Sequence, residues 1–180
     1  MIPRFIACLL ILFLLPLFLL TSIYIICFDG KPVLFKQKRA GRCETFFYIY
    51  KFRTMKKSTP DIPTDKLKSN PFYFGGQILR KLSIDEIPQL LNIIKGEMKF
   101  IGPRPALHNQ YNLIQRRLEL NISSLYPGIT GLAQINGRDK ITEEEKIAFD
   151  KYYLDNKSII LDFKILLKTF TKVFSIKDIN

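Results

Sequence analysis

The strongest pattern in the chain is an apolar run near its N-terminus. From Phe5 to Phe28 there are 24 residues without a charge, dominated by Leu, Ile and Phe. As a straight helix this run would be about 36 Å long, enough to cross the hydrocarbon core of a bilayer. Pro16 lies near its middle, where it removes a helical hydrogen bond and bends the axis. The run predicts a membrane-bound protein, with either a kinked spanning helix or a re-entrant hairpin; these residues alone favour spanning.

The next pattern is that of a β-hairpin over residues 33–54. Aromatic and β-branched residues flank a turn at residues 40–42. Lys51 and Arg53 alternate with Tyr50 and Phe52, so the two charges share one face of the second strand. Two cations on one face predict a binding site for a diphosphate. The alternative is a basic patch that binds anionic lipid.

Residues 82–105 contain a predicted helix that starts near Asp85 and carries two adjacent carboxylates. Ser83 and Glu86 have the spacing of a capping box, and an apolar repeat continues to Lys95 and Gly96. Unpaired N–H groups and the helix dipole at such a start keep a carboxylate ionised and attract phosphate. Asp85 and Glu86 are therefore candidates for chemistry on an anionic substrate. Taken singly, each residue is better explained by structure, Glu86 as part of the helix cap and Asp85 as an acidic first-turn residue.

Three patterns follow Arg104. A helix is predicted to about Asn121, with Leu107, Tyr111, Ile114 and Leu118 on one face. Gly128 and Gly131 bracket two residues and predict a close approach of the backbone to a ligand or another strand. Thr142 and Glu145 form a second capping box, which predicts a helix to about Tyr153.

The last segment, residues 158–176, is amphipathic. Lys164, Lys168 and Lys172 follow one another four residues apart, opposite an apolar face. Such a helix either packs on the core with its lysines in water or lies in the plane of lipid headgroups. Residues 56–76 are polar and rich in Pro and Gly, which predicts a long loop, either a substrate cover or a connector.

Charge and cysteine usage narrow the class of protein. The formal net charge is +12, and residues 31–57 hold nine Lys or Arg against one acidic residue. This predicts an anionic partner, namely nucleic acid, a membrane surface or a phosphorylated substrate. Basic residues directly after the apolar run place the following part on the cytoplasmic side. Three cysteines without a regular spacing and a single histidine support neither a disulfide framework, a zinc site nor a Ser-His-Asp triad.

Several blocks, in order along nearly the whole chain, closely resemble the signature of the bacterial sugar transferases, and in particular of the small, PglC-like monotopic phosphoglycosyl transferases. The blocks are Lys51-Phe-Arg-Thr-Met55, the Leu-Ser-x-Asp-Glu-Ile-Pro-Gln-Leu-x-Asn motif around Asp85 and Glu86, Ile101-Gly-Pro-Arg-Pro105, Pro127 to Arg138, and the Tyr152 to Asp162 region.

The resemblance implies transfer of a sugar 1-phosphate from a UDP-sugar to polyprenol (undecaprenyl) phosphate, with release of UMP. This would be the first membrane step of surface glycan assembly, for lipopolysaccharide O-antigen, capsule or a protein-linked glycan. It implies a helix-rich α+β fold at the bacterial inner membrane. Residues 1–29 would be a membrane-inserted helix, now expected to be re-entrant and broken at Pro16. Residues 30–180 would be a cytoplasmic catalytic domain with a small β-hairpin and amphipathic interfacial helices.

The resemblance also implies roles for individual residues. Asp85 matches the nucleophile that forms an aspartyl phospho-sugar, and Glu86 would act as a base or help to bind Mg²⁺ together with Asp85. Lys51, Arg104 and Arg138 match positions that bind phosphate or nucleotide, and Arg53 is added by its place on the strand. We expect no nucleic-acid partner and see no sign of an obligate protein partner. The rival interpretations are a membrane-tethered basic nucleic-acid-binding module and a catalytically inactive scaffold.

Overall fold

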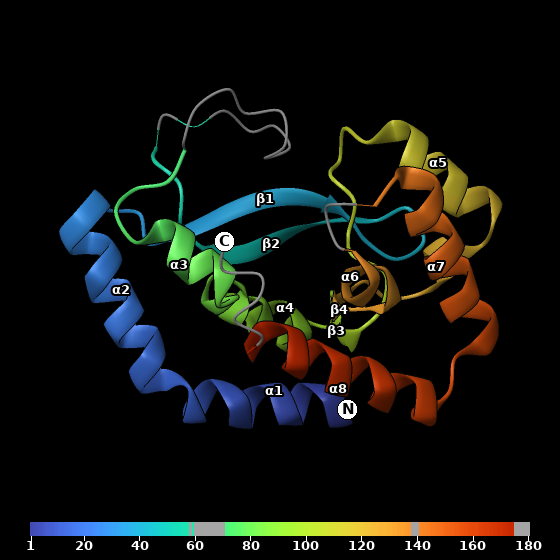
Figure 1. Ribbon diagram of the computed structural model, residues 1–180, viewed down its shortest axis with the longest axis horizontal. Helices are drawn as coiled ribbons and strands as arrows, with labels where there is room; N and C mark the ends of the chain where they lie inside the picture. Colours follow the sequence, from blue (N-terminus) through green and yellow to red (C-terminus); the bar gives the residue numbers. More distant parts are fainter. Residues whose placement is uncertain (58, 60–70, 138–140, 175–180) are drawn as a thin grey trace.

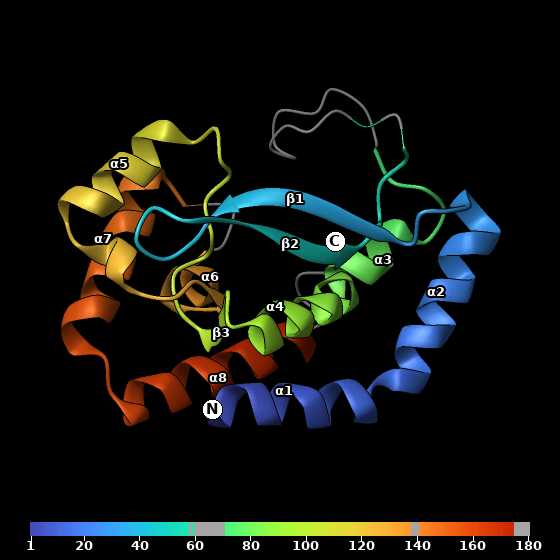
Figure 2. The same cartoon turned by 180° about the vertical axis from the view of Figure 1, so that it is seen from behind.

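The computed structural model describes residues 1–57, 59, 71–137 and 141–174. Helices surround two small sheets, as Figures 1 and 2 show from opposite sides, so the expected helix-rich α+β class is confirmed. The elements in chain order are α1 (Ile2–Phe13), α2 (Leu15–Asp29), β1 (Leu34–Ala40), β2 (Phe46–Phe52), α3 (Gly76–Lys81), η2 (Ile84–Gln89), α4 (Leu90–Lys95), β3 (Lys99–Ile101), α5 (Tyr111–Glu119), η3 (Ile122–Ser124), β4 (Gly128–Thr130), α6 (Leu132–Asn136), α7 (Glu143–Asn156) and α8 (Ile159–Phe174).

The apolar N-terminal run is two helices rather than one. α1 and α2 meet at Leu14 with a bend of 61°, and Pro16 lies in the first turn of α2, where its missing N–H costs little. The bend that Pro16 predicts is therefore confirmed. Among the described residues, no single helix has the length and apolar character to cross a membrane, whereas this bent pair together does.

The predicted hairpin is confirmed. β1 and β2 pair antiparallel from Leu34 opposite Phe52 to Ala40 opposite Phe46. The other edge of β2 is met by a side chain of α4. Asn92, which is fully buried, accepts a hydrogen bond from the Tyr50 N–H (3.1 Å) and donates one to the Tyr48 carbonyl (2.7 Å). The Asn92 amide thus fixes α4 against β2.

The predicted helix from Asp85 to Lys95 is divided. Pro88 has no N–H to donate, and the chain forms the 3₁₀-helix η2 before α4 begins at Leu90. α4 ends, as predicted, at Lys95, and Gly96 directly after it has the left-handed conformation with φ of 81°. The capping box at Ser83 is wrong: Ser83 is itself left-handed, with φ of 55°, and its side chain makes no cap hydrogen bond. The Glu86 side chain is instead bound by Lys51.

A short parallel pair, β3 with β4, joins the two halves of the chain, with Lys99 opposite Gly128 and Ile101 opposite Thr130. The backbones come so close that a Cβ on Gly128 would lie 2.2 Å from the Gly102 nitrogen, and one on Gly131 would lie 2.1 Å from the Gly102 oxygen. The close approach expected at these glycines is confirmed, and the neighbour is a strand and the loop that follows it.

The helix expected directly after Arg104 begins later, at Tyr111. Residues before it pair with the hairpin instead, because the Ala40 N–H donates to the Ala106 carbonyl and Arg39 bridges to Leu107. The expected apolar face is also wrong in part, since Tyr111 is exposed and Leu113 is buried. The capping box of α7 is confirmed, with both of its hydrogen bonds present between Thr142 and Glu145.

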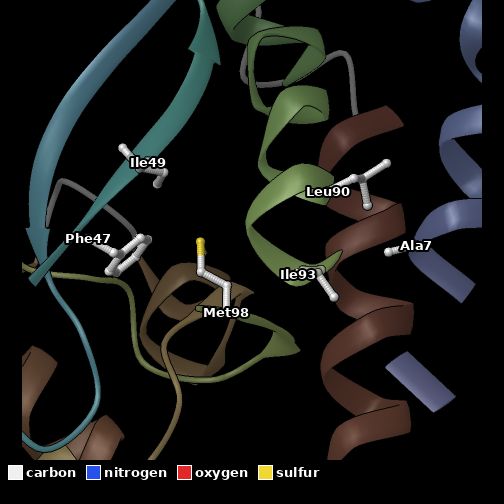
Figure 3. Packing of buried hydrophobic residues seen from close by; sticks show 6 residues of the cluster. All are labelled: Ala7, Phe47, Ile49, Leu90, Ile93 and Met98. Carbon is white, nitrogen blue, oxygen red and sulfur yellow. The ribbon is translucent and has the colours of Figure 1, made fainter. Parts of the chain in front are cut away.

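The core consists of clusters that connect α1 and α2 to the rest of the chain. One cluster contains Ala7 of α1, Phe47 and Ile49 of β2, and Leu90, Ile93 and Met98 (Figure 3). In Figure 3 the Met98 side chain lies between those of β2 and those of α4. A second cluster contains Ile25 of α2, Phe52 and Tyr73, and includes Ile84 and Ile87 of η2. The N-terminal helices therefore pack directly on the elements that carry the candidate site.

α1 and α8 lie along the same side of the molecule in both views (Figures 1 and 2). α8 packs on the core through Ile165 and Leu161. Its other large apolar side chains from Ile159 to Phe170 are exposed, so this part of α8 is more than a core helix with a solvated stripe. The exposed apolar side chains of the two helices are Ile2, Phe5, Ile6, Leu9, Leu12, Phe13, Ile159, Ile160, Phe163, Leu166, Leu167 and Phe170. We call this set the apolar face.

Candidate active site

The two adjacent carboxylates lie on η2, which packs against β2. Asp85 and Glu86 are 5% and 7% exposed, so both are almost fully removed from water. A carboxylate at such a depth is stable as a charge only with close partners. The surroundings of Asp85 and Glu86 therefore decide what they can do.

Two cations from distant parts of the chain reach Glu86. The Lys51 ammonium lies 2.8 Å from Glu86 Oε1, and the Arg104 guanidinium lies 3.3 Å from the same oxygen through Nη1. Lys51 comes from β2, and Arg104 comes from the loop after β3. The structure thus brings together four of the predicted site residues, Asp85, Glu86, Lys51 and Arg104.

Burial lowers the pKa of Lys51 below its ordinary value of 10.5, although Glu86 acts in the opposite direction. Arg104 also lowers this pKa, because two positive charges near one carboxylate repel each other. Burial and Arg104 thus disfavour the charge of Lys51, and Glu86 favours it. A second anion, such as a phosphate, would relieve the repulsion between Lys51 and Arg104.

The loop that carries Arg104 is held from behind by two further arginines. Arg117 of α5 donates from Nη1 to the Arg104 carbonyl (2.9 Å), and Arg39 donates from Nη1 to the Pro105 carbonyl (3.1 Å). Arg117 also forms an ion pair of 2.6 Å with Asp150 of α7, which is 1% exposed. Burial raises the pKa of Asp150, and Arg117 opposes the rise. The backbone of Arg104 is thereby tied to two helices.

Sequence reasoning missed Arg117 and Asp150, although the pattern held a signal. Arg117 comes four residues after buried Leu113, and Asp150 comes three residues from both Ile147 and Tyr153, which are buried. In each case a charge lies on the buried side of a helix. Such a charge requires a partner, and these two partner each other.

Arg53 pairs with a different carboxylate from the one that Lys51 contacts. Arg53 Nη2 lies 2.9 Å from a carboxylate oxygen of Asp29, at the end of α2, and donates to the Asp29 carbonyl at 2.8 Å. Arg53 is therefore bound to the N-terminal helices. Arg138, the remaining predicted phosphate-binding residue, lies outside the described residues, as do residues 58 and 60–70 of the predicted loop.

The donor set is compatible with magnesium. The described residues contain no group of three or more His, Cys, Asp or Glu side chains that would enclose a metal ion. Mg²⁺ is commonly held by one or two carboxylates, with substrate phosphate and water as its other ligands. Asp85 and Glu86 supply two such carboxylates side by side.

An apolar cavity of about 180 Å³ lies beside the Arg104 loop, under the hairpin turn. Arg104 and Arg117 are among its lining residues, whereas Asp85, Glu86 and Lys51 are not. The cavity therefore adjoins the site through the Arg104 loop and is not part of the charged cluster.

Comparison with known proteins identifies the family. Residues 1–176 match the bacterial sugar transferase family. The chain is 44% identical over 147 residues to an uncharacterized sugar transferase, EpsL, of Bacillus subtilis, covering 80% of this chain and 71% of EpsL. It is 37% identical over 163 residues to the UDP-glucose:undecaprenyl-phosphate glucose-1-phosphate transferase of Caulobacter vibrioides, covering 86% of this chain and 61% of that protein.

A third relative is much longer than this chain. The undecaprenyl-phosphate galactose phosphotransferase of Salmonella typhimurium is 32% identical over 158 residues, covering 78% of this chain and 33% of that protein. The similarity to these relatives extends over most of the present chain and includes the elements that carry the charged cluster. The chain therefore belongs to the bacterial sugar transferase family.

Proposed function

We propose that the protein transfers a sugar 1-phosphate from a UDP-sugar to undecaprenyl phosphate and releases UMP. The observation that carries the proposal is the buried cluster of Asp85 and Glu86 with Lys51 and Arg104. A cluster of two carboxylates and two cations offers both a nucleophile and a binding place for phosphate. The names of the relatives from Caulobacter and Salmonella support the acceptor and the type of reaction.

In the first step Asp85 attacks the β-phosphorus of the donor. A bond forms between a carboxylate oxygen and phosphorus, the bond from phosphorus to the UMP oxygen breaks, and UMP leaves with that electron pair. In the second step a phosphate oxygen of undecaprenyl phosphate attacks the same phosphorus and displaces Asp85. The product is an undecaprenyl diphosphate sugar, and the carboxylate is regenerated.

Lys51 and Arg104 stabilise the negative charge of the reacting phosphates. Both cations already converge on Glu86 Oε1, so Glu86 positions them beside Asp85 before a substrate arrives. Arginine and lysine bonds to phosphate are charge-assisted and strong. Asp85 and Glu86 would hold a magnesium ion, which when bound would neutralise diphosphate charge as a Lewis acid. We propose that Arg138 adds a further contact to the nucleotide.

The apolar face supports a membrane position that suits this acceptor. α1 and α8 lie along the same side of the molecule, and large apolar patches exposed on a protein surface mark sites of contact with a partner or a membrane. Lysines on α8, such as Lys164 and Lys168, would contact lipid phosphates while the apolar residues enter the interface. We propose that α1 and α2 re-enter the membrane, and that the catalytic part lies on its cytoplasmic side. The step would begin assembly of a bacterial surface glycan.

The test is to detect the covalent intermediate. Purified protein in detergent with magnesium is incubated with UDP-glucose or UDP-galactose, without acceptor, and its intact mass is measured. We expect an added mass of one sugar phosphate and release of UMP, both absent from Asp85→Asn. The matched control is Asp155→Asn, which changes an exposed carboxylate of α7 and should behave as wild type. An adduct that persists in Asp85→Asn would reject Asp85 as the nucleophile.

A further inference from the structure

The contacts of Arg53 suggest a role that differs from phosphate binding. Arg53 directly follows β2 and is 6% exposed. Its Nη2 contacts the Asp29 carboxylate and the carbonyls of Asp29 and Gly30, which are at the C-terminal end of α2. Carbonyls at that end of a helix lack intrahelical partners, and the end carries negative partial charge. Arg53 thus supplies the cation and the donor that the end of α2 requires.

The backbone of Arg53 is also fixed on both sides. Its N–H donates to the Val33 carbonyl (2.9 Å), and its carbonyl accepts from the buried Tyr73 hydroxyl (2.6 Å). These bonds determine where the guanidinium begins, so the side chain can hold α2 in one place.

The residues before Arg53 connect the same junction to the candidate site. Phe52 packs against Phe18 of α2, with ring centroids 4.7 Å apart, and it belongs to the cluster that includes Ile84 and Ile87 of η2. Lys51 reaches Glu86 of η2. Three consecutive residues therefore make three different contacts. Lys51 contacts Glu86, Phe52 contacts the side of α2, and Arg53 contacts the end of α2. A shift of α2 would be transmitted to the strand end that places Lys51.

We propose that the Asp29–Arg53 ion pair fixes the end of α2 to the end of β2, and that Arg53 is a positioning residue through which the N-terminal helices set the geometry of Lys51 and Glu86. The effect on catalysis rests on the proposed function. The attachment of α2 does not, and it can be measured without substrate.

The first experiment measures amide hydrogen exchange of the detergent-purified protein. Asp29→Asn keeps the size of the side chain and removes its charge, and Arg53→Gln removes the cation. We expect faster exchange in both variants at the last turn of α2, where the Gly30 N–H bonds to the Ile26 carbonyl, and at residues 49–53. Asp155→Asn should show neither change. Unchanged exchange in both Asp29→Asn and Arg53→Gln would overturn the proposal.

The second experiment separates positioning from phosphate binding by a double-mutant cycle on steady-state kinetics. If Arg53 positions Lys51 through α2, each single variant should lower kcat roughly tenfold with little change in the donor KM. The kcat of the double variant should then be no lower than that of the less active single variant. If Arg53 instead binds the donor phosphate, Arg53→Gln should raise the donor KM while Asp29→Asn behaves as wild type, which would overturn the proposal. A wild-type protein without transfer activity would reject the proposed function, and the exchange experiment would still decide the attachment.

Discussion

At the scale of single residues, the charge on Glu86 is balanced by one cation from β2 and one from the Arg104 loop. The two cations differ in how readily they lose their proton. Arginine stays protonated at any pH at which the protein is folded, whereas lysine loses its proton more easily when it is buried. Of the two cations, Lys51 is therefore the one whose charge depends on pH.

The lowered pKa of Lys51 predicts a loss of activity on the alkaline side. As the pH rises through this pKa, Lys51 becomes neutral, and the cluster loses a positive charge that would stabilise the phosphates of the proposed substrates. We expect kcat/KM for the donor to fall with an inflection below 10.5, the ordinary value for lysine. In Lys51→Arg the inflection should disappear. Lys36→Arg, which changes an exposed lysine of the same hairpin, should retain it; an inflection retained in Lys51→Arg would contradict the assignment.

At the scale of elements, the Arg104 loop is attached to α5 and α7 through Arg117 and Asp150. Removal of one partner leaves a buried charge without compensation, which in other proteins costs about 3 to 5 kcal/mol. Arg117→Met should therefore lower the free energy of unfolding by about 3 kcal/mol. Urea denaturation followed by circular dichroism measures this quantity.

The control for Arg117→Met is an ion pair on the surface of α7. Lys151 and Asp155 lie 2.6 Å apart, but their side chains are 40% and 50% exposed. Exposed pairs of this kind contribute less than about 1 kcal/mol. Lys151→Met should thus leave the unfolding midpoint almost unchanged, and equal losses in the two variants would argue against a special role for the buried pair.

Elements with strong local signals were predictable from the sequence. The hairpin follows from its residue types and turn, and α7 follows from a capping box whose two hydrogen bonds are both present. At Ser83 the same local signal failed, because Lys51 and Arg104 bind Glu86 more strongly than a cap N–H would. The β3 and β4 strands were missed because three residues are too few to show alternation. Only their glycines indicated a close approach.

The sequence predicted the residues of the charged cluster, but not the residues that hold the surrounding elements in place. Asp85, Glu86, Lys51 and Arg104 stand in blocks that resemble a family signature, and the structure brings them together. Asn92, Arg117 and Asp29 form hydrogen bonds with residues 13 to 44 positions away in the chain. Local periodicity contains no information on such pairs. It shows only that a polar residue lies on a buried face.

At the scale of the whole molecule, α1 and α8 lie along the same side and both contribute exposed side chains to the apolar face (Figure 1). If this surface contacts lipid, a charge placed on it should weaken membrane binding without unfolding the protein. Phe163 and Leu167 of α8 are 60% and 52% exposed. We expect Phe163→Glu with Leu167→Glu to reduce co-sedimentation with phosphatidylglycerol vesicles roughly tenfold or more.

Tyr111→Glu is the matched control for vesicle binding, because Tyr111 is 74% exposed on α5, on the opposite side of the molecule from α1 and α8 (Figure 1). It should bind vesicles as wild type does. Equal binding by all three proteins would show that α8 makes no contribution to membrane attachment.

The hydrogen bonds from Asn92 to β2 also bear on strand pairing between copies of the protein. A two-stranded hairpin has two outer edges, and an open edge can pair with a strand from another molecule. One outer edge, that of β2, is occupied where the Asn92 amide bonds to Tyr48 and Tyr50. A foreign strand cannot add at these residues unless α4 moves away, and that movement would also displace η2 and its carboxylates. In this part of the molecule, protection of the β2 edge and preservation of the candidate active site depend on the same side chain.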